Sequence, residues 1–106
     1  MQGTHPMMAV IQPSGALNAA NAYALQRQLS ENITAEHSRG LVVDMSRVES
    51  LDSAGLVSLI TGLRLARGLS KQFCLCAVPP SIRIVLELTQ LDRVFEVLET
   101  VPARAA

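Results

Sequence analysis

The sequence predicts an α/β fold built on a largely parallel β-sheet. Three apolar segments of strand length, near residues 7–12, 41–45 and 73–78, are separated by segments whose apolar side chains recur every three or four residues. Strands that alternate with amphipathic helices are joined by crossover connections, and such connections make neighbouring strands parallel. At 106 residues the chain is expected to form one domain, residues 1–106, in which residues 1–6 are flexible.

The composition predicts an aliphatic core and argues against several classes of function. Hydrophobic residues make up 49% of the chain but aromatic residues only 3%, and nine basic residues balance nine acidic ones. Without a cluster of Lys and Arg the chain lacks the electrostatic footprint of a nucleic-acid-binding protein. No apolar run approaches the roughly 20 residues that span a bilayer, and the N-terminus does not resemble a signal peptide. We therefore expect a cytoplasmic protein.

In the first half of the chain the pattern predicts a strand, a turn and a helix. Residues 7–12 are expected to form the strand, and Pro13-Ser14-Gly15 has the composition of a turn. The helix is expected from Asn18 to Ile33, with Asn18 as its N-cap. Its apolar positions have the spacing of a helix that lies on a sheet, namely Ala22, Leu25, Leu29 and Ile33.

The middle of the chain predicts a buried strand and a second helix. Ser38-Arg39-Gly40 is expected to break the chain before the continuous apolar run at residues 41–45, which is typical of a strand covered on both faces. The helix is marked by Leu56, Leu59, Ile60 and Leu63, with Asp52 and Ser53 at or just before its N-terminus, and it is expected to stop near Gly68. Gly62 lies inside this helix at some energetic cost, so we expect it to pack closely against a neighbouring element.

The last third predicts a strand, a helix and a short closing strand. Residues 73–78 form another continuous apolar run, and Pro80 suits the first turn of a helix that reaches Leu88. Residues 94–97 alternate between apolar and polar side chains, which indicates the closing strand.

The two cysteines, Cys74 and Cys76, are expected to be buried neighbours without a chemical role. Residues two apart in an extended segment face the same side of a sheet, which suits adjacent thiols better than a disulfide. A single Cys-x-Cys lacks the second ligand pair that a zinc site needs. Free thiols in the core are consistent with a reducing compartment.

The segment Asp52-Ser53-Ala54-Gly55-Leu56 carries the strongest functional signal. It lies between a buried strand and an amphipathic helix, at the sheet edge where open α/β sheets bind ligands and partners. A serine hydroxyl at a helix N-terminus can cap the helix, and it can also carry a phosphate there. The motif alone supports both interpretations equally.

Taken together, these residues resemble a STAS domain of the anti-sigma factor antagonist kind. The resemblance extends from about Met7 to Glu99, and its most specific element is the Asp-Ser-x-Gly-Leu sequence at residues 52–56. Weaker matches are found at Gly15-Ala16-Leu17, Leu41-Val42-Val43-Asp44-Met45, Cys76-Ala77-Val78-Pro79-Pro80 and Leu91-Asp92-Arg93-Val94-Phe95.

The resemblance implies a small mixed, largely parallel sheet with helices packed mostly on one face, and a binding module rather than an enzyme. Ser53 would be phosphorylated by a histidine-kinase-like serine kinase that is also an anti-sigma factor. The unphosphorylated chain would bind that partner and free a sigma factor, and a serine phosphatase would reset the switch. The chain would need no cofactor, because ATP belongs to the kinase. Partner contact is expected at Asn18, Asp52, Ser53, Ala54, Gly55 and Leu56.

One residue departs from the family pattern. Many antagonists have an aspartate where this chain has Asn18, and an amide keeps the hydrogen-bonding capacity of that side chain without its charge.

Two other functions remain open from the sequence. The chain could be a STAS subunit that docks on a transporter ATPase through the Ser53 end and is never phosphorylated. A hydrolase with Ser53 as nucleophile is less well supported, because the chain has no Gly-x-Ser-x-Gly elbow and neither histidine is expected near a strand end.

Overall fold

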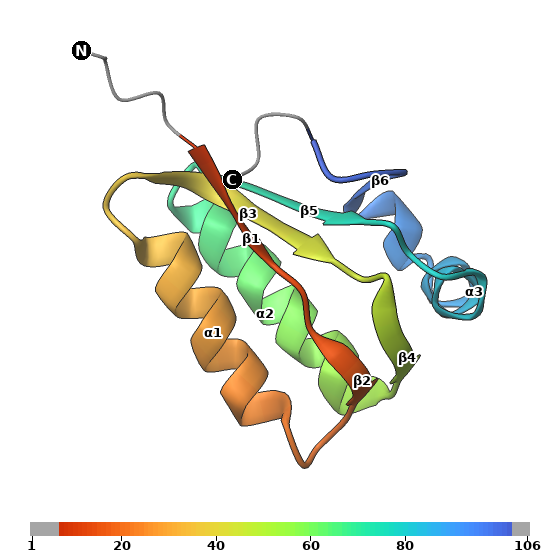
Figure 1. Ribbon diagram of the computed structural model, residues 1–106. Coiled ribbons are helices and arrows are strands. Elements are labelled where there is room, and N and C mark those ends of the chain that lie inside the picture. Colours follow the sequence, from red (N-terminus) through yellow and green to blue (C-terminus); the bar gives the residue numbers. More distant parts are fainter. Residues whose placement is uncertain (1–6, 103–106) are drawn as a thin grey trace.

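A computed structural model, which describes residues 7–102, contains a four-stranded sheet in the order β1-β3-β5-β6 (Figure 1). Every neighbouring pair in this sheet is parallel, as the sequence predicts. The strands are β1 (Met7–Ile11), β3 (Ser38–Asp44), β5 (Gln72–Cys76) and β6 (Glu96–Leu98). The expected flexibility of residues 1–6 concerns positions outside the described range.

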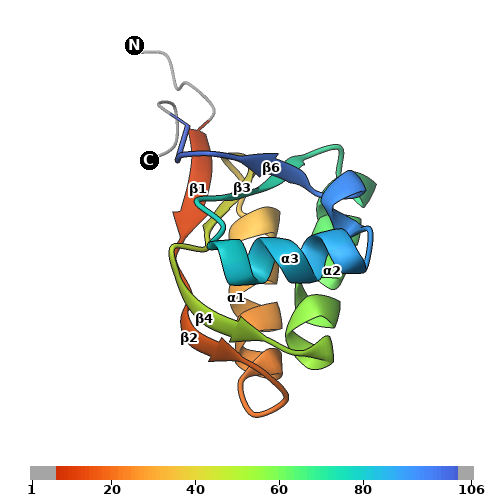
Figure 2. The same ribbon diagram turned by 90° about the vertical axis from the view of Figure 1, so that its right-hand side faces the viewer.

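Three helices enclose the main core on one side of this sheet. Helices α1 (Ala22–Thr34) and α2 (Ser53–Gly68) lie side by side against the sheet, while α3 (Pro80–Leu88) closes the core beside β4, next to the short helix η1 (Leu91–Arg93) (Figure 2). The core is almost entirely aliphatic, as expected, because apolar side chains from α1, α2 and α3 meet those of β3 and β5 in one cluster. No helix within residues 7–102 is both long enough and apolar enough to cross a membrane.

The structure contains a second pair of strands that the sequence did not predict. Strands β2 (Ser14–Leu17) and β4 (Arg47–Leu51) are parallel and form a separate two-stranded sheet. The interpretation of Pro13-Ser14-Gly15 as a turn is therefore wrong for Ser14 and Gly15. A shift of register between Gly15 and Ala16 obscures the alternation that would have indicated a strand.

The first helix begins later than expected, and Asn18 is not its cap. The N-cap is Asn21. The Oδ1 atom of Asn18 instead accepts a hydrogen bond from the N–H of Ala20 at 2.9 Å, which closes a local turn before the helix starts. The error arose because alanines favour a helix by intrinsic propensity, whereas here the turn formed by two asparagines overrides that preference.

Smaller corrections concern the ends of other elements. Strand β5 ends at Cys76, and the closing strand is Glu96–Leu98 because Val94 follows the short helix η1. Helix α2 begins at Ser53, which agrees with the expected helix start at Asp52 and Ser53. Gly40 does not break the chain but lies within β3. A Cβ atom there would collide with the Gln72 carbonyl oxygen, so β3 and β5 approach more closely at this point than a side chain allows.

Gly62 lies at a close contact, as expected. A Cβ atom at this position would come within 3.0 Å of Phe73 Cε2 and 3.1 Å of Leu29 Cδ1. Glycine therefore lets the middle of α2 pack directly on α1 and β5.

The other face of the sheet carries a separate apolar cluster. Its buried members are Val42, Cys74 and Cys76, and partly buried Met8, Val10 and Leu98 pack against them. Among the described residues, no helix packs on this face, as the resemblance implied. Both cysteines are free and buried, which confirms the prediction of neighbouring core thiols.

We expect these thiols to be unreactive in the folded chain. Burial, reinforced by Glu96 and Cys76, raises the pKa of Cys74 to about 11, and burial together with Asp44 raises the pKa of Cys76. Because the thiolate is the reactive form, a disulfide-exchange reagent at about pH 8 should label neither thiol in the native protein and both in denaturant. Rapid labelling of the native protein would contradict this burial.

The same shift predicts how stability depends on pH. The native state keeps the Cys74 proton between pH 9.0 and about 11, whereas the unfolded chain loses it. The stabilisation is therefore complete below pH 9 and is lost progressively as the pH rises through this window. Replacing Cys74 by alanine should reduce the slope of unfolding free energy against pH in this range, whatever it does to absolute stability.

Candidate functional site

The candidate site is the N-terminus of α2, where β4 ends at Leu51. Asp52 is the N-cap with an extended backbone, and its Oδ1 atom accepts a hydrogen bond from the N–H of Gly55 at 3.0 Å. This bond satisfies one of the donors left free at a helix start, so the cap is Asp52 and not the Ser53 hydroxyl.

Ser53 is the first residue of α2 and is exposed to solvent. Its hydroxyl forms no hydrogen bond with any of residues 7–102. Because Asp52 already caps the helix, the Ser53 hydroxyl is not required for capping. The side chain is therefore accessible to another protein and is not committed to a structural role.

Gly55 fixes the position of α2 against the end of β2. A Cβ atom on Gly55 would lie 2.6 Å from the Leu17 carbonyl oxygen and 2.8 Å from Leu51 Cδ1. The same carbonyl accepts a hydrogen bond from the Asp52 N–H at 3.1 Å. The missing Cβ of Gly55 therefore allows the close approach of α2 to the end of β2.

The loop that follows β2 lies beside this helix start. Asn18 follows Leu17 directly, so the Leu17–Asp52 hydrogen bond brings Asn18 next to the start of α2. The side chain of Asn21 holds the loop, because its Oδ1 accepts from the Asn18 N–H at 2.9 Å and its Nδ2 donates to the Ala16 carbonyl at 2.7 Å. Asn18 is half-buried, and its Oδ1 atom accepts the hydrogen bond from the Ala20 N–H.

The six residues expected to contact a partner differ in exposure. Asp52 and Ser53 are exposed, and Asn18, Ala54 and Leu56 are half-buried. Gly55 is buried and Leu56 packs on the core, so these two residues influence the shape of the surface but contribute little exposed area to it.

Two exposed apolar residues, which the sequence reasoning missed, lie beside this surface. Val57, 54% exposed, is one helical turn after Ser53, and Tyr23 is 74% exposed on the first turn of α1. The hydroxyl of Ser58 lies 3.3 Å from the Ala22 carbonyl, where α2 contacts α1. Val57 precedes Ser58 in the chain and Tyr23 follows Ala22, so both residues flank this contact between the helices. The spacing of four residues between Ser53 and Val57 was the available sequence signal.

The site has little charge of its own. Residues 13–26 contain no charged side chain, and Asp52 is the only one within residues 50–63. A phosphate on Ser53 would therefore meet no lysine or arginine from these two segments. Nowhere in residues 7–102 do three potential metal ligands gather.

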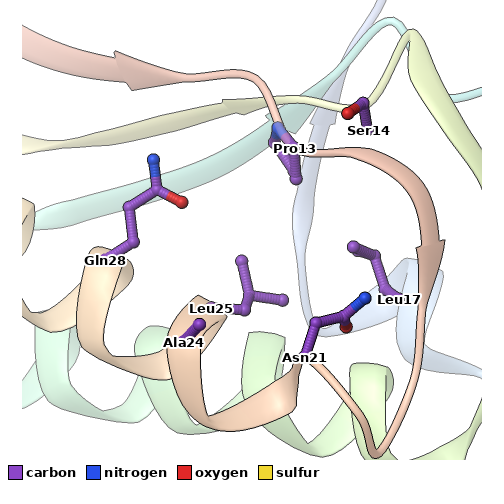
Figure 3. Close-up of a pocket in the computed structure, with 7 residues that line it drawn as sticks. All are labelled: Pro13, Ser14, Leu17, Asn21, Ala24, Leu25 and Gln28. Atoms are coloured by element: carbon purple, nitrogen blue, oxygen red, sulfur yellow. The ribbon is translucent and has the colours of Figure 1, made fainter.

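A shallow hollow lies between α1 and the junction of β1 and β2 (Figure 3). Its volume is about 180 Å³, and it is lined by Pro13, Ser14, Leu17, Asn21, Ala24, Leu25 and Gln28. No ionisable residue and none of the six expected contact residues lines it, so the hollow does not include the Ser53 hydroxyl.

Removing the cap of α2 should lower stability measurably. We expect Asp52→Ala to reduce the free energy of unfolding by about 1 kcal/mol, because the Gly55 N–H loses its partner. Asp52→Asn keeps an oxygen acceptor at the same place and should change stability much less. Equal denaturation midpoints for Asp52→Ala and the unaltered chain would show that the bond to Gly55 contributes nothing.

The chain is similar over most of its length to known proteins. The STAS domain family matches residues 2–103. BtrV of Bordetella bronchiseptica, named as an anti-sigma factor antagonist, is 29% identical over 92 residues, which cover 87% of this chain and 78% of that protein.

Solved structures show the same similarity. An anti-sigma factor antagonist from Mycobacterium paratuberculosis has a TM-score of 0.76 and 32% identity, covering 87% of this chain and 77% of that one. One from Thermotoga maritima has a TM-score of 0.79 and 25% identity, covering 87% and 79%. The extent of the family match, together with the parallel sheet and its one-sided helices, shows that the chain belongs to the STAS domain family.

Proposed function

We propose that this chain is an anti-sigma factor antagonist that is switched by phosphorylation of Ser53. In its unphosphorylated form it binds an anti-sigma factor that is also a serine kinase, and so frees a sigma factor. The observation that carries the proposal is the exposed Ser53 hydroxyl, which sits at the start of α2 without a structural partner among the described residues. The similarity to relatives named as anti-sigma factor antagonists also supports this proposal.

The chemistry of the switch needs only the hydroxyl from this chain. The Ser53 oxygen attacks the terminal phosphorus of ATP held by the kinase, ADP leaves, and the hydroxyl proton passes to a base of the kinase. A phosphatase later hydrolyses the ester and restores the hydroxyl. This chain is therefore substrate and ligand in turn, and the proposed exchange of partners takes place in the cytoplasm.

Phosphorylation should act on binding and leave the fold intact. A phosphate adds about −1.5 to −2 charges at the positive end of the α2 dipole, which favours an anion by about 0.3–1 kcal/mol. Asp52, one residue away, opposes this gain. A partner surface that accepts a neutral hydroxyl has no such compensation, and an unpaired charge in an interface costs several kcal/mol.

The surroundings of Ser53 suit a protein partner. Tyr23 and Val57 expose apolar surface on either side of the α1–α2 contact, and large side chains such as tyrosine are common anchors in interfaces. We propose that these two residues extend the contact surface formed by Asn18, Asp52, Ser53, Ala54, Gly55 and Leu56.

The proposal is tested by incubating the chain with its cognate kinase and ATP, followed by mass spectrometry. The kinase can be identified by pull-down or by the neighbourhood of its gene. We expect one phosphate on the unaltered chain and none on Ser53→Ala. Ser50→Ala is the matched control, since Ser50 is also exposed and lies three residues away in β4. Phosphate mapped to Ser50 or elsewhere would overturn the assignment.

A further inference from the structure

Strand β1 forms an open edge of the main sheet. Among residues 7–102 it pairs only with β3, and outside that ladder no described backbone hydrogen bond involves Met7–Ile11. In a parallel pair, alternate residues direct their N–H and C=O groups away from the neighbouring strand. These groups of β1 therefore face outward, ready to pair with another extended chain.

Charge and proline, two usual protections of an edge strand, are missing from β1, whose sequence is Met-Met-Ala-Val-Ile. Its ladder with β3 has one shift of register between Met7 and Ala9 and is regular from Ala9 to Ile11. The opposite edge, β6, is only three residues long, with exposed glutamates at Glu96 and Glu99. Proteins normally protect edges by such shortness and charge. The contrast marks β1 as the edge suited to pairing.

We infer that β1 pairs in antiparallel fashion with β1 of a second copy of this chain, about a two-fold axis perpendicular to the sheet. Such an axis places side chains of β1 opposite side chains of β1 from the second copy. Any charged residue in β1 would therefore face a like charge across the contact. The strand has none, and the chain as a whole carries a net charge of zero. No charge on β1 therefore repels β1 of a second copy.

The pairing would also extend an apolar face. Met8 and Val10 pack against the cluster of Val42, Cys74 and Cys76 on the face without helices, and they are only partly buried. The two-fold axis keeps the two copies of Met8 and Val10 on the same face of the joined sheet. One apolar cluster would then continue across both molecules.

The proposed contact is independent of the phosphorylation site. Strand β1 and the N-terminal end of α2, beside β4, lie well apart in both views (Figures 1 and 2). Ser53 would remain exposed in the dimer, so a failure of either proposal leaves the other unaffected.

The test is sedimentation velocity over a range of concentrations, with charge variants at the edge. We expect a reversible dimer whose dissociation constant rises by roughly tenfold or more in Met8→Glu and in Met8→Lys, because like charges then face each other. An equimolar mixture of the two variants should restore the dimer. Ile84→Glu, at a residue of α3 that is 54% exposed, is the control and should dimerise normally.

Three results would overturn the inference: a monomer at every concentration, a dimer that the Met8 variants leave unchanged, or one that Ile84→Glu disrupts instead. If the Met8 variants do not fold, as judged by circular dichroism, hydrogen exchange on the unaltered chain decides. Those amides within Ala9–Ile11 that point away from β3 should become more protected as concentration rises. Protection of these outward amides that does not change with concentration would contradict pairing with a second copy.

Discussion

Replacing Ser53 by aspartate should weaken binding to the anti-sigma kinase by roughly a hundredfold or more, which corresponds to about 2.7 kcal/mol. The carboxylate places a permanent charge where the partner accepts a neutral hydroxyl, and residues 13–26 and 50–63 contain no cation to neutralise it. Isothermal titration calorimetry with the purified kinase measures this change directly.

The controls separate charge from size and from folding. Ser53→Ala should bind nearly as well as the unaltered chain, and Ser53→Asn matches the size of aspartate without its charge. Because Ser53 is exposed and makes no bond within the described residues, we expect Ser53→Asp to change the free energy of unfolding by less than about 1 kcal/mol. Equal loss of affinity in Ser53→Asn and Ser53→Asp would show that shape, not charge, controls the contact.

Replacing Gly55 by alanine should have the largest effect on stability among substitutions at the site. The added Cβ would lie 2.6 Å from the Leu17 carbonyl oxygen, a backbone atom that cannot rotate away. We expect the free energy of unfolding to fall by about 1–3 kcal/mol, as for other overpacked positions. A loss of 1 kcal/mol in a chain of this size lowers the melting temperature by roughly 4–8 °C.

Gly68 provides the matched control in the same helix. A Cβ atom there would meet nothing within 4 Å, and Gly68 is the last residue of α2. Gly68→Ala should therefore leave stability unchanged or raise it by up to about 1 kcal/mol. Calorimetric melting of both variants checks the comparison, and similar melting temperatures would refute the close approach of α2 to β2. Gly55→Ala should also weaken kinase binding, because the strain displaces the loop at Asn18 relative to Ser53.

The sequence predicted the main sheet because its strands are continuous apolar runs. Val42 and Val43 are fully buried, and so are Leu75 and Cys76, so burial on both faces left a clear pattern. The pair β2–β4 was missed since only Val48 and Leu51 are buried in β4, and an irregular register disturbs the alternation. Two buried residues are too weak a signal to identify a strand when the neighbouring strand that pairs with it is not known.

The site was predictable in part for a similar reason. Asp52 and Ser53 carry a local signature of a helix start, so their position and exposure followed from the sequence. The role of Asn21 did not, because it depends on the Ala16 carbonyl, which the fold of β2 brings near. The proposed place of Tyr23 on the contact surface depends on the packing of α1 on α2, and such contacts between distant residues leave no local pattern.

The central claim is tested most directly by measuring how tightly the kinase binds two forms of the chain. The quantity is the dissociation constant for the chain phosphorylated at Ser53 divided by that for the unmodified chain. If modification acts on binding while the fold persists, this ratio should reach about a hundred or more, with the two forms melting within a few degrees of each other. Equal affinities for the two forms would contradict a phosphorylation switch at Ser53.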